Sequence, residues 1–258
     1  MCGIAGITGT RLDPAQIARI DSAMQHRGPD SAGTFLSDQV SLLHRRLAIL
    51  DPTDLGKQPM TSAEGRYTLV LNGEIYNFQA LKRDLPLQEW RTGTDTEVIL
   101  AALIHHGPAA LSHFNGMFAL ALWDDRETQL MVARDRMGIM PLYVTHLGEH
   151  LAFASEARTL MAFPGVERRL NREALAHYFT YMTAYGRSTL VEGIELLPGG
   201  SYATWKAGQY REVQYWDVGD LQNKTVSDDR KTVVAQVREH LNRAVDRRMI
   251  SDVPLGAF

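Results

Sequence analysis

The stretch that decides the fold is MCGIAGI, residues 1–7, which places the only cysteine of the chain, Cys2, directly behind Met1. If Met1 is removed, Cys2 becomes the N-terminus and carries both a thiol nucleophile and a free α-amine that serves as its base. An α-amine with a pKa of ~7.7 to 8.0 is partly neutral at neutral pH and accepts a thiol proton. A lone cysteine is more often a structural thiol, so the rest of the sequence has to show whether Cys2 is a nucleophile.

Length and composition restrict the class of protein. With 258 residues, 45% of them hydrophobic, the chain can bury a large core and exceeds one small domain. Its net charge of -3 provides no broad basic surface for nucleic acid or anionic lipid. A single cysteine and the lack of a signal peptide or of ~18 consecutive apolar residues favour a cytoplasmic protein without nucleic-acid or membrane partners.

The hydrophobic pattern predicts many strands and a few helices. Apolar residues at three- and four-residue spacing predict helices over 13–26, 78–85 and 95–107, and a Gly/Pro loop over 27–33. Runs rich in β-branched and aromatic residues predict strands at 2–9, 40–50, 66–78, 117–125, 129–135, 141–147 and 150–155. Such a succession of antiparallel-looking strands with few helices favours an α+β fold.

The character of the chain changes after residue 215. Residues 216–232 are polar and predict a linker, residues 233–249 form an amphipathic helical pattern, and residues 251–258 look like a strand. A helix and one strand cannot bury a core by themselves. We therefore expect a first domain over 1–215 and the opening of a second domain over 216–258.

Two basic or glycine-rich clusters have both a structural and a functional interpretation. HRGPD at 26–30 is typical of a turn, with Asp30 as a cap. In HRRLAILD at 44–51, strand alternation points Arg45 and Arg46 to opposite faces, so that one of them can enter a pocket. An arginine fork matches a substrate carboxylate, although a surface arginine is the better interpretation of this cluster alone.

Two further clusters carry a similar ambiguity. In LVLNGEIYN at 69–77 the Asn-Gly pair favours a hairpin turn by roughly three to one. The alternative is that the Asn72 side chain and the Gly73 N–H face a developing oxyanion. In GTDTEVI at 93–99, Thr94 or Asp95 is expected to cap a helix, and Asp95 could instead hold a substrate ammonium group.

Other clusters point to structure. In ARDRMGIMPLY at 133–143, Arg134, Asp135 and Arg136 are interpreted as an ion-pair turn. The sequence has no H-E-x-x-H, no paired C-x-x-C and no glycine-rich phosphate loop. We therefore expect no metal site in this chain.

Taken in order, the clusters resemble one family. The matching segments are MCGIAGI, HRGPD, HRRLAILD, QPM, LVLNGEIYN, TGTDTEVIL, FNGMFALALWD, ARDRMGIMPLY, FASEARTL and LPGGSY. They resemble the N-terminal glutaminase domain of glutamine-hydrolysing asparagine synthetase, a class II glutamine amidotransferase. The chain departs from the family at Met140, where a lysine is common, and in LPGG at 197–200, where LPPG is usual.

The resemblance implies a fold for both parts of the chain. The first part is implied to be an N-terminal-nucleophile hydrolase, an αββα four-layer sandwich of two antiparallel sheets. The helix at 233–249 and the segment RRMISDVPLGAF resemble the lead-in to the α/β, ATP-pyrophosphatase-type synthetase domain of the family. The expected α+β class agrees with the strand-rich pattern.

The resemblance also implies roles for individual residues. Cys2 is the implied nucleophile, with its own α-amine as general base once Met1 is gone, and Asn72 and Gly73 form the implied oxyanion hole. The thiolate attacks the side-chain amide of glutamine, forms a γ-glutamyl thioester and releases ammonia, and water then releases glutamate.

Three more residues are implied to bind the substrate. Arg46 matches the arginine that grips the α-carboxylate of glutamine, Glu74 helps to hold glutamine, and Asp95 binds its α-ammonium group. No metal or cofactor is expected for this hydrolysis. ATP and Mg²⁺ belong to the synthetase domain, which in a full-length parent converts aspartate to asparagine.

Several alternatives stay open at this point. The partner of the glutaminase site is expected to be the synthetase domain of the same parent chain, and a homodimer is a possible assembly. If the 258 residues are the entire molecule, we expect glutamine hydrolysis without amide transfer. Other possibilities are an amidotransferase that acts on a different acceptor and a non-catalytic domain that retains the fold.

Overall fold

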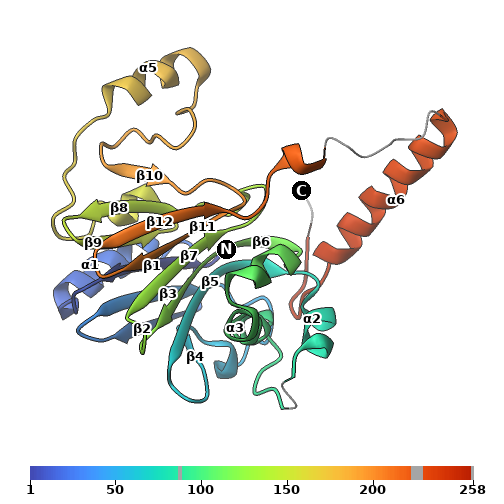
Figure 1. The fold of residues 1–258 in the computed structure, drawn as a ribbon, viewed down its shortest axis with the longest axis horizontal. Coiled ribbons are helices and arrows are strands. Elements are labelled where there is room, and N and C mark those ends of the chain that lie inside the picture. Colours follow the sequence, from blue (N-terminus) through green and yellow to red (C-terminus); the bar gives the residue numbers. More distant parts are fainter. Residues whose placement is uncertain (87–88, 222–228, 257–258) are drawn as a thin grey trace.

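The computed structural model describes residues 1–86, 89–221 and 229–256 (Figure 1). Within these residues the chain forms two antiparallel sheets of six strands each. The first sheet has the order β10-β8-β9-β1-β3-β2, made by Ile194–Leu196, Tyr143–Leu147, His150–Ala154, Gly3–Thr8, Val40–Arg46 and Ser31–Leu36. β1 lies between β9 and β3 and is buried along its whole length. The stretch that follows Cys2 is therefore a central strand.

The second sheet carries the longest strands. Its order is β12-β11-β7-β6-β5-β4, made by Gln209–Gln214, Ser201–Lys206, Gln129–Arg134, Gly116–Asp124, Tyr67–Ile75 and Met60–Thr61. β5 and β6 pair over their full nine residues, with Asn72 opposite Ala119. This register fixes where the end of β5 lies relative to the rest of the sheet.

The two sheets pack face to face, with helices on both outer surfaces. The layer between the sheets combines side chains of both, including Phe153 of the first sheet and Trp123 of the second. α1 (Pro14–Met24) and α4 (Ala157–Leu160) cover the first sheet, while α2 (Phe78–Asp84) and α3 (Asp95–His106) cover the second. The predicted αββα sandwich and α+β class are confirmed.

The remaining elements lie at the edges of the sandwich. They are the 3₁₀ turns η1 (Asp54–Gly56), η2 (Gly107–His113) and η3 (Val218–Leu221), and the helices α5 (Arg172–Tyr181) and α6 (Arg230–Arg248). In Figure 1, α5 and α6 project away from the two sheets. No helix in the described part of the chain is long and apolar enough to cross a membrane.

The hairpin expected at Asn72-Gly73 is wrong. β5 runs through both residues without a turn and stays paired with β6. Gly73 has φ +145°, and a Cβ at this position would lie 2.0 Å from the Met117 carbonyl oxygen. The glycine is therefore required by a close approach of two backbones inside a sheet, and the long pairing with β6 overrides the local turn preference.

The loop expected over 27–33 is also partly wrong, because β2 begins at Ser31. β2 is half exposed and contains small polar residues, so its sequence has no strand signal of its own. It forms because β3 offers a free edge to pair with. The turn expected around Asp135 exists, but Asp135 accepts backbone N–H groups from Phe118, Ile139 and Met140 and forms no ion pair with the residues that the structure describes.

The strand expected at 251–258 is absent from its described part, 251–256. Its polar groups bond to a loop instead: the Asp252 N–H donates to the Ile49 carbonyl (3.1 Å), and the Asp51 N–H donates to the Asp252 carboxylate (2.7 Å). A strand needs a partner strand, and none lies beside this segment among the described residues.

The helix predicted over 233–249 is confirmed as α6. Its apolar stripe is exposed, with Val237, Leu241 and Val245 each more than half accessible. Residues 222–228 of the predicted linker and the last two residues of the predicted strand lie outside the described residues.

Candidate active site

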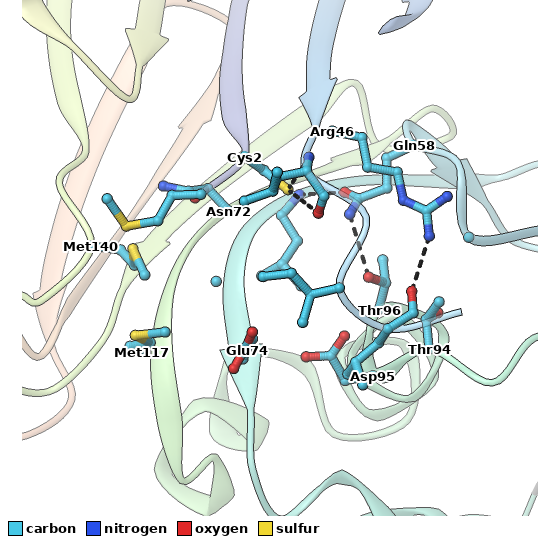
Figure 2. A pocket seen from close by; sticks show the side chains of 17 residues that line it. Cys2, Arg46, Gln58, Asn72, Glu74, Thr94, Asp95, Thr96, Met117 and Met140 are labelled. Carbon is cyan, nitrogen blue, oxygen red and sulfur yellow. Dashed lines mark hydrogen bonds between the residues drawn. The ribbon is translucent and has the colours of Figure 1, made fainter. Parts of the chain in front are cut away.

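A pocket opens at the N-terminal end of β1, where β3, β5 and α3 converge (Figure 2). Every residue for which the sequence predicts a role in the site lies in its wall. The lining residues are Met1, Cys2, Arg46, Leu47, Ile49, Leu50, Gly56, Gln58, Leu71, Asn72, Gly73, Glu74, Thr94, Asp95, Thr96, Met117 and Met140. Residues from widely separated segments of the chain thus meet around one thiol.

Cys2 is held at this position because the strand that follows it pairs with β3 from Gly3 onward and with β9 from Ala5 onward. Its Sγ lies 3.5 Å from the Leu47 N–H nitrogen and 3.7 Å from the Leu47 carbonyl oxygen. Burial raises the pKa of the thiol, while the Leu47 backbone and the nearby positive charges act in the other direction. With Met1 attached, the nitrogen of Cys2 is an amide and has no basic lone pair.

Arg46 and Arg45 point to opposite faces of β3, as strand alternation predicts. Arg45 pairs with Asp21 on the outer helix α1. Arg46 lines the pocket, only 6% exposed, and its guanidinium donates to the carbonyl oxygens of Thr53 (2.8 Å) and Leu50 (3.0 Å) and to that of Asp51 (2.5 Å). These bonds use three of its five N–H donors and leave the others for a ligand.

Asn72 is the most unusual polar residue in the pocket. It is fully buried, and neither its Oδ1 nor its Nδ2 has a hydrogen-bond partner among the described residues. Leaving such a group unpaired costs about 1–3 kcal/mol. An unpaired amide that faces a pocket next to a thiol indicates a place where a ligand or a reacting group completes the hydrogen bonds.

Two carboxylates form the far side of the pocket (Figure 2). Asp95 is the first residue of α3, which is capped by Thr94, and its carboxylate accepts the Ile75 N–H at 2.8 Å. Burial, together with the negative charge of the nearby Glu74, raises the pKa of Asp95 to about 7. Burial also raises the pKa of Glu74. Neither carboxylate has an ion-pair partner in the described part of the chain, which suits a cationic group of a ligand.

Gln58 is a pocket residue to which the sequence analysis assigns no role. It is 8% exposed, and its Oε1 accepts the Leu71 N–H at 2.6 Å while its Nε2 lies 3.4 Å from Thr96 Oγ1. Gln58 thereby ties β5 to α3 beside Asn72. The segment QPM contains it, but no pattern in the sequence predicts this bridge.

The HRGPD segment packs against the strand that carries Arg46. A Cβ on Gly28 would lie 2.3 Å from the Arg45 backbone, and the Asp30 carboxylate accepts the Ala48 N–H at 2.8 Å. A turn is present in this segment, but Asp30 does not cap it: its carboxylate bonds to the loop that follows β3 and supports that loop.

The chemistry of the pocket can be stated from these groups. It combines a thiol, an unpaired amide, a guanidinium with free donors and two carboxylates, which suits an α-amino acid whose side chain reaches the thiol. No group of His, Cys, Asp and Glu residues in the described ranges has an arrangement that could hold a metal ion. The nucleophilic side chain in the pocket is the thiol of Cys2.

Comparison with known proteins agrees with this geometry. Residues 1–216 match the family model for the glutamine amidotransferase domain. The asparagine synthetase [glutamine-hydrolyzing] 3 of Bacillus subtilis is 32% identical over 267 residues, covering 100% of this chain and 43% of the relative. The amidase chry2 of Gibberella zeae is 34% identical over 239 residues, covering 90% of this chain and 35% of the relative.

A solved structure shares the fold. The glutamine phosphoribosylpyrophosphate amidotransferase from B. subtilis has a TM-score of 0.61 at 20% identity, covering 83% of this chain and 49% of that chain. The chain spans less than half the length of the relatives named above. The chain belongs to the class II glutamine amidotransferase family, and its first 216 residues are homologous to the N-terminal glutaminase part of glutamine-hydrolysing asparagine synthetases.

Proposed function

We propose that this chain hydrolyses glutamine to glutamate and ammonia, with Cys2 as the nucleophile after removal of Met1. The observation that carries the proposal is the fully buried, unpaired side chain of Asn72 in the same pocket as the only thiol of the protein. A structural core would not retain such an amide, whereas an oxyanion site requires one.

In the proposed reaction the α-amine of Cys2 accepts the thiol proton, and the thiolate attacks the side-chain carbonyl carbon of glutamine. The carbonyl oxygen becomes an oxyanion that accepts hydrogen bonds from the Asn72 side chain and the Gly73 N–H. Transfer of the proton from the α-ammonium to the leaving nitrogen releases ammonia and leaves a γ-glutamyl thioester. Water, deprotonated by the same amine, then cleaves the thioester to glutamate and the free thiol.

The other pocket residues fit the backbone groups of glutamine. Arg46 keeps two donors for the α-carboxylate, and Glu74 and Asp95 provide negative charge for the α-ammonium group. The side chain of glutamine then extends from Arg46, Glu74 and Asp95 to the thiol of Cys2. Glutamine is thus proposed to lie with its amide at Cys2 and its ammonium group at α3.

The carboxylate of Asp95 gives the binding of glutamine a defined pH dependence. In the empty pocket its pKa is about 7, and only the ionised form attracts an ammonium group. Glutamine affinity is therefore expected to fall as the pH drops through 7, with the Kd rising about tenfold between pH 8 and pH 6. Calorimetry on the Cys2→Ala variant measures this without turnover.

Asp95→Asn is the control for this prediction. The variant should bind glutamine more weakly at pH 8 and should show less than about a threefold change in Kd over the same pH range, because the titrating charge is gone. An equally steep pH dependence in Asp95→Asn would assign the titration to another group, such as Glu74.

The whole protein is proposed to use the ammonia for amide transfer. The relative from B. subtilis is named a glutamine-hydrolysing asparagine synthetase, so the acceptor we propose is aspartate, activated with ATP and Mg²⁺ in a synthetase domain of the same parent chain. Residues 216–258 are proposed to lead into that domain. A reducing compartment such as the cytoplasm suits the free thiol of Cys2, and a homodimer is the proposed assembly.

A different acceptor is the second candidate. The relative chry2 is named an amidase and matches 90% of this chain, so a related sequence also occurs in a protein that is named for a different activity. Glutaminase residues would be the same in both cases. Assays of the full-length parent with aspartate and with other carboxylic acids separate the two candidates.

The direct test is glutamate release. The chain is purified, loss of Met1 is established by intact mass, and glutamate and ammonia are measured with glutamine as the sole substrate. Equal amounts of both products are expected without ATP or metal. A processed, folded chain that releases neither would contradict the proposed function and would favour a non-catalytic domain with this fold.

A further inference from the structure

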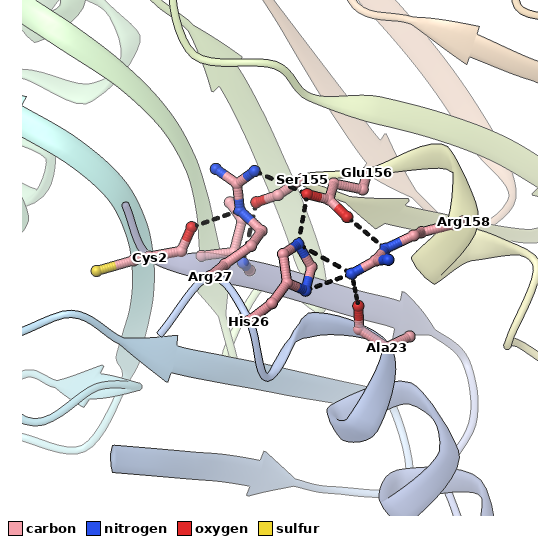
Figure 3. Close-up of polar contacts among 8 residues, drawn as sticks. Cys2, Ala23, His26, Arg27, Ser155, Glu156 and Arg158 are labelled. Carbon is pink, nitrogen blue, oxygen red and sulfur yellow. Dashed lines mark hydrogen bonds and ion pairs between the residues drawn. The ribbon is translucent and has the colours of Figure 1, made fainter. Parts of the chain in front are cut away.

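A second polar cluster lies behind Cys2, outside the pocket (Figure 3). Its centre is the carboxylate of Glu156, which follows β9. Oε1 accepts hydrogen bonds from Arg27 Nη1 and pairs with His26 Nε2, both at 2.9 Å, and Oε2 accepts from Arg158 Nε at 2.7 Å. The cluster joins the HRGPD turn to the start of α4.

Glu156 is fixed in place by the central strand. Its neighbour Ser155 donates its N–H to the Ile4 carbonyl at 2.9 Å, and Ser155 Oγ accepts the Ile4 N–H at 3.0 Å. These two bonds continue the pairing of β9 with β1 by one residue. The position of the Glu156 backbone is therefore set by the same strand that carries Cys2 at its end.

Arg27 connects the cluster to the nucleophile. Its Nε donates to the Cys2 carbonyl oxygen at 2.8 Å, while its Nη1 is bound by Glu156. The Arg27 side chain is only 9% exposed. A buried guanidinium that loses its counter-charge is strongly unfavourable, so the bond between Arg27 and Cys2 depends on the carboxylate of Glu156.

This carbonyl bond matters because of the proposed processing. Once Met1 is removed, Cys2 is joined to the protein by a single peptide bond, and the sheet pairing of β1 begins only at Gly3. The bond from Arg27 to the Cys2 carbonyl then orients, together with the contacts between Sγ and the Leu47 backbone, the residue that supplies both thiol and amine. A nucleophile displaced by about 1 Å loses on the order of a hundredfold in rate.

We propose that Glu156 is a positioning residue for catalysis: it holds Arg27, and Arg27 holds Cys2 through its main-chain carbonyl. The inference rests on the proposed glutaminase function. Although burial acts to raise it, the hydrogen bonds from His26 and Arg27 keep the pKa of Glu156 below its ordinary value. The carboxylate is therefore charged throughout the working pH range.

The test is the variant Glu156→Gln, which keeps the shape and removes the charge. The expected result is a fall in kcat for glutamate release of about 10- to 100-fold with KM changed less than about threefold, because the glutamine-binding residues are untouched. Glu156→Asp keeps the charge on a shorter side chain and should recover part of kcat. If Glu156→Gln fails to fold, the kcat of Glu156→Asp is compared with that of the wild type instead.

A second readout separates positioning from a merely structural effect. Cys2 is the only cysteine, so alkylation reports on it alone. Inactivation by a diazoketone analogue of glutamine requires the thiol at the right place in the pocket and should slow at least about tenfold in Glu156→Gln. Iodoacetamide needs no bound orientation, and its rate should stay within about twofold.

Arg158→Met is the matched control. Arg158 binds the same carboxylate, has no hydrogen bond to Arg27 or Cys2 within the described residues, and is 54% exposed in its side chain, so its loss should change kcat less than about threefold. Wild-type kcat in both Glu156 variants, or an equal loss in Arg158→Met, would overturn the inference. An inactive processed wild-type chain would instead contradict the proposed function itself.

Discussion

Replacing Cys2 by alanine is expected to abolish glutamate release, with a loss of at least about a thousandfold relative to the processed wild-type chain. No other side chain can replace the nucleophile, because Cys2 is the only thiol in the sequence and lies in the pocket with the unpaired Asn72. The γ-glutamyl thioester cannot form without it. Steady-state release and mass analysis of acid-quenched protein with glutamine measure both effects.

The control for this prediction keeps the thiol and removes only the amine. A chain that retains Met1, as established by intact mass, still carries Cys2 but has an amide nitrogen in place of the base. It should be inactive, and removal of Met1 by an aminopeptidase should restore glutamate release. Equal activity of the Met1-bearing and processed forms would exclude the α-amine as the general base.

The fold was largely predictable because its core strands repeat a strong hydrophobic pattern. The stretches that became β1, β3, β5, β6, β7, β8 and β9 were all predicted as strands, and α1, α2, α3 and α6 as helices. Strands such as β2 escaped prediction because their half-exposed sequences depend on a neighbouring edge. Pairing partners far away in the chain cannot be inferred from a local pattern.

The candidate site also contains residues that local sequence patterns predict and residues that depend on distant segments of the chain. Local rules favoured a turn at Asn72-Gly73, whereas the structure keeps both residues in β5 because Gly73 allows close contact with the β6 backbone. The family resemblance, unlike the local pattern, predicts that Asn72 and Gly73 lie in the substrate pocket. It left out the supporting residues Gln58 and Glu156, whose partners come from distant segments.

Asn72→Ala is expected to lower kcat for glutamine hydrolysis by about 10²- to 10³-fold, which corresponds to about 3–4 kcal/mol of lost transition-state stabilisation. The amide is fully buried and has no partner among the described residues, so its Nδ2 is available to the oxyanion that forms next to Cys2. KM should change little, because Arg46, Glu74 and Asp95 still bind the substrate. Steady-state kinetics of the processed variant measure both constants.

Stability distinguishes this effect from damage to the fold. A buried amide that bonds to nothing already costs free energy in the empty protein, so removing it should leave the melting temperature within about 3 °C of the wild type. Asn171→Ala, which removes the N-cap of α5 far from the pocket, is the matched control and should keep wild-type kcat. A large loss of melting temperature in Asn72→Ala, or unchanged kcat, would show that Asn72 serves the core and that the oxyanion is stabilised elsewhere.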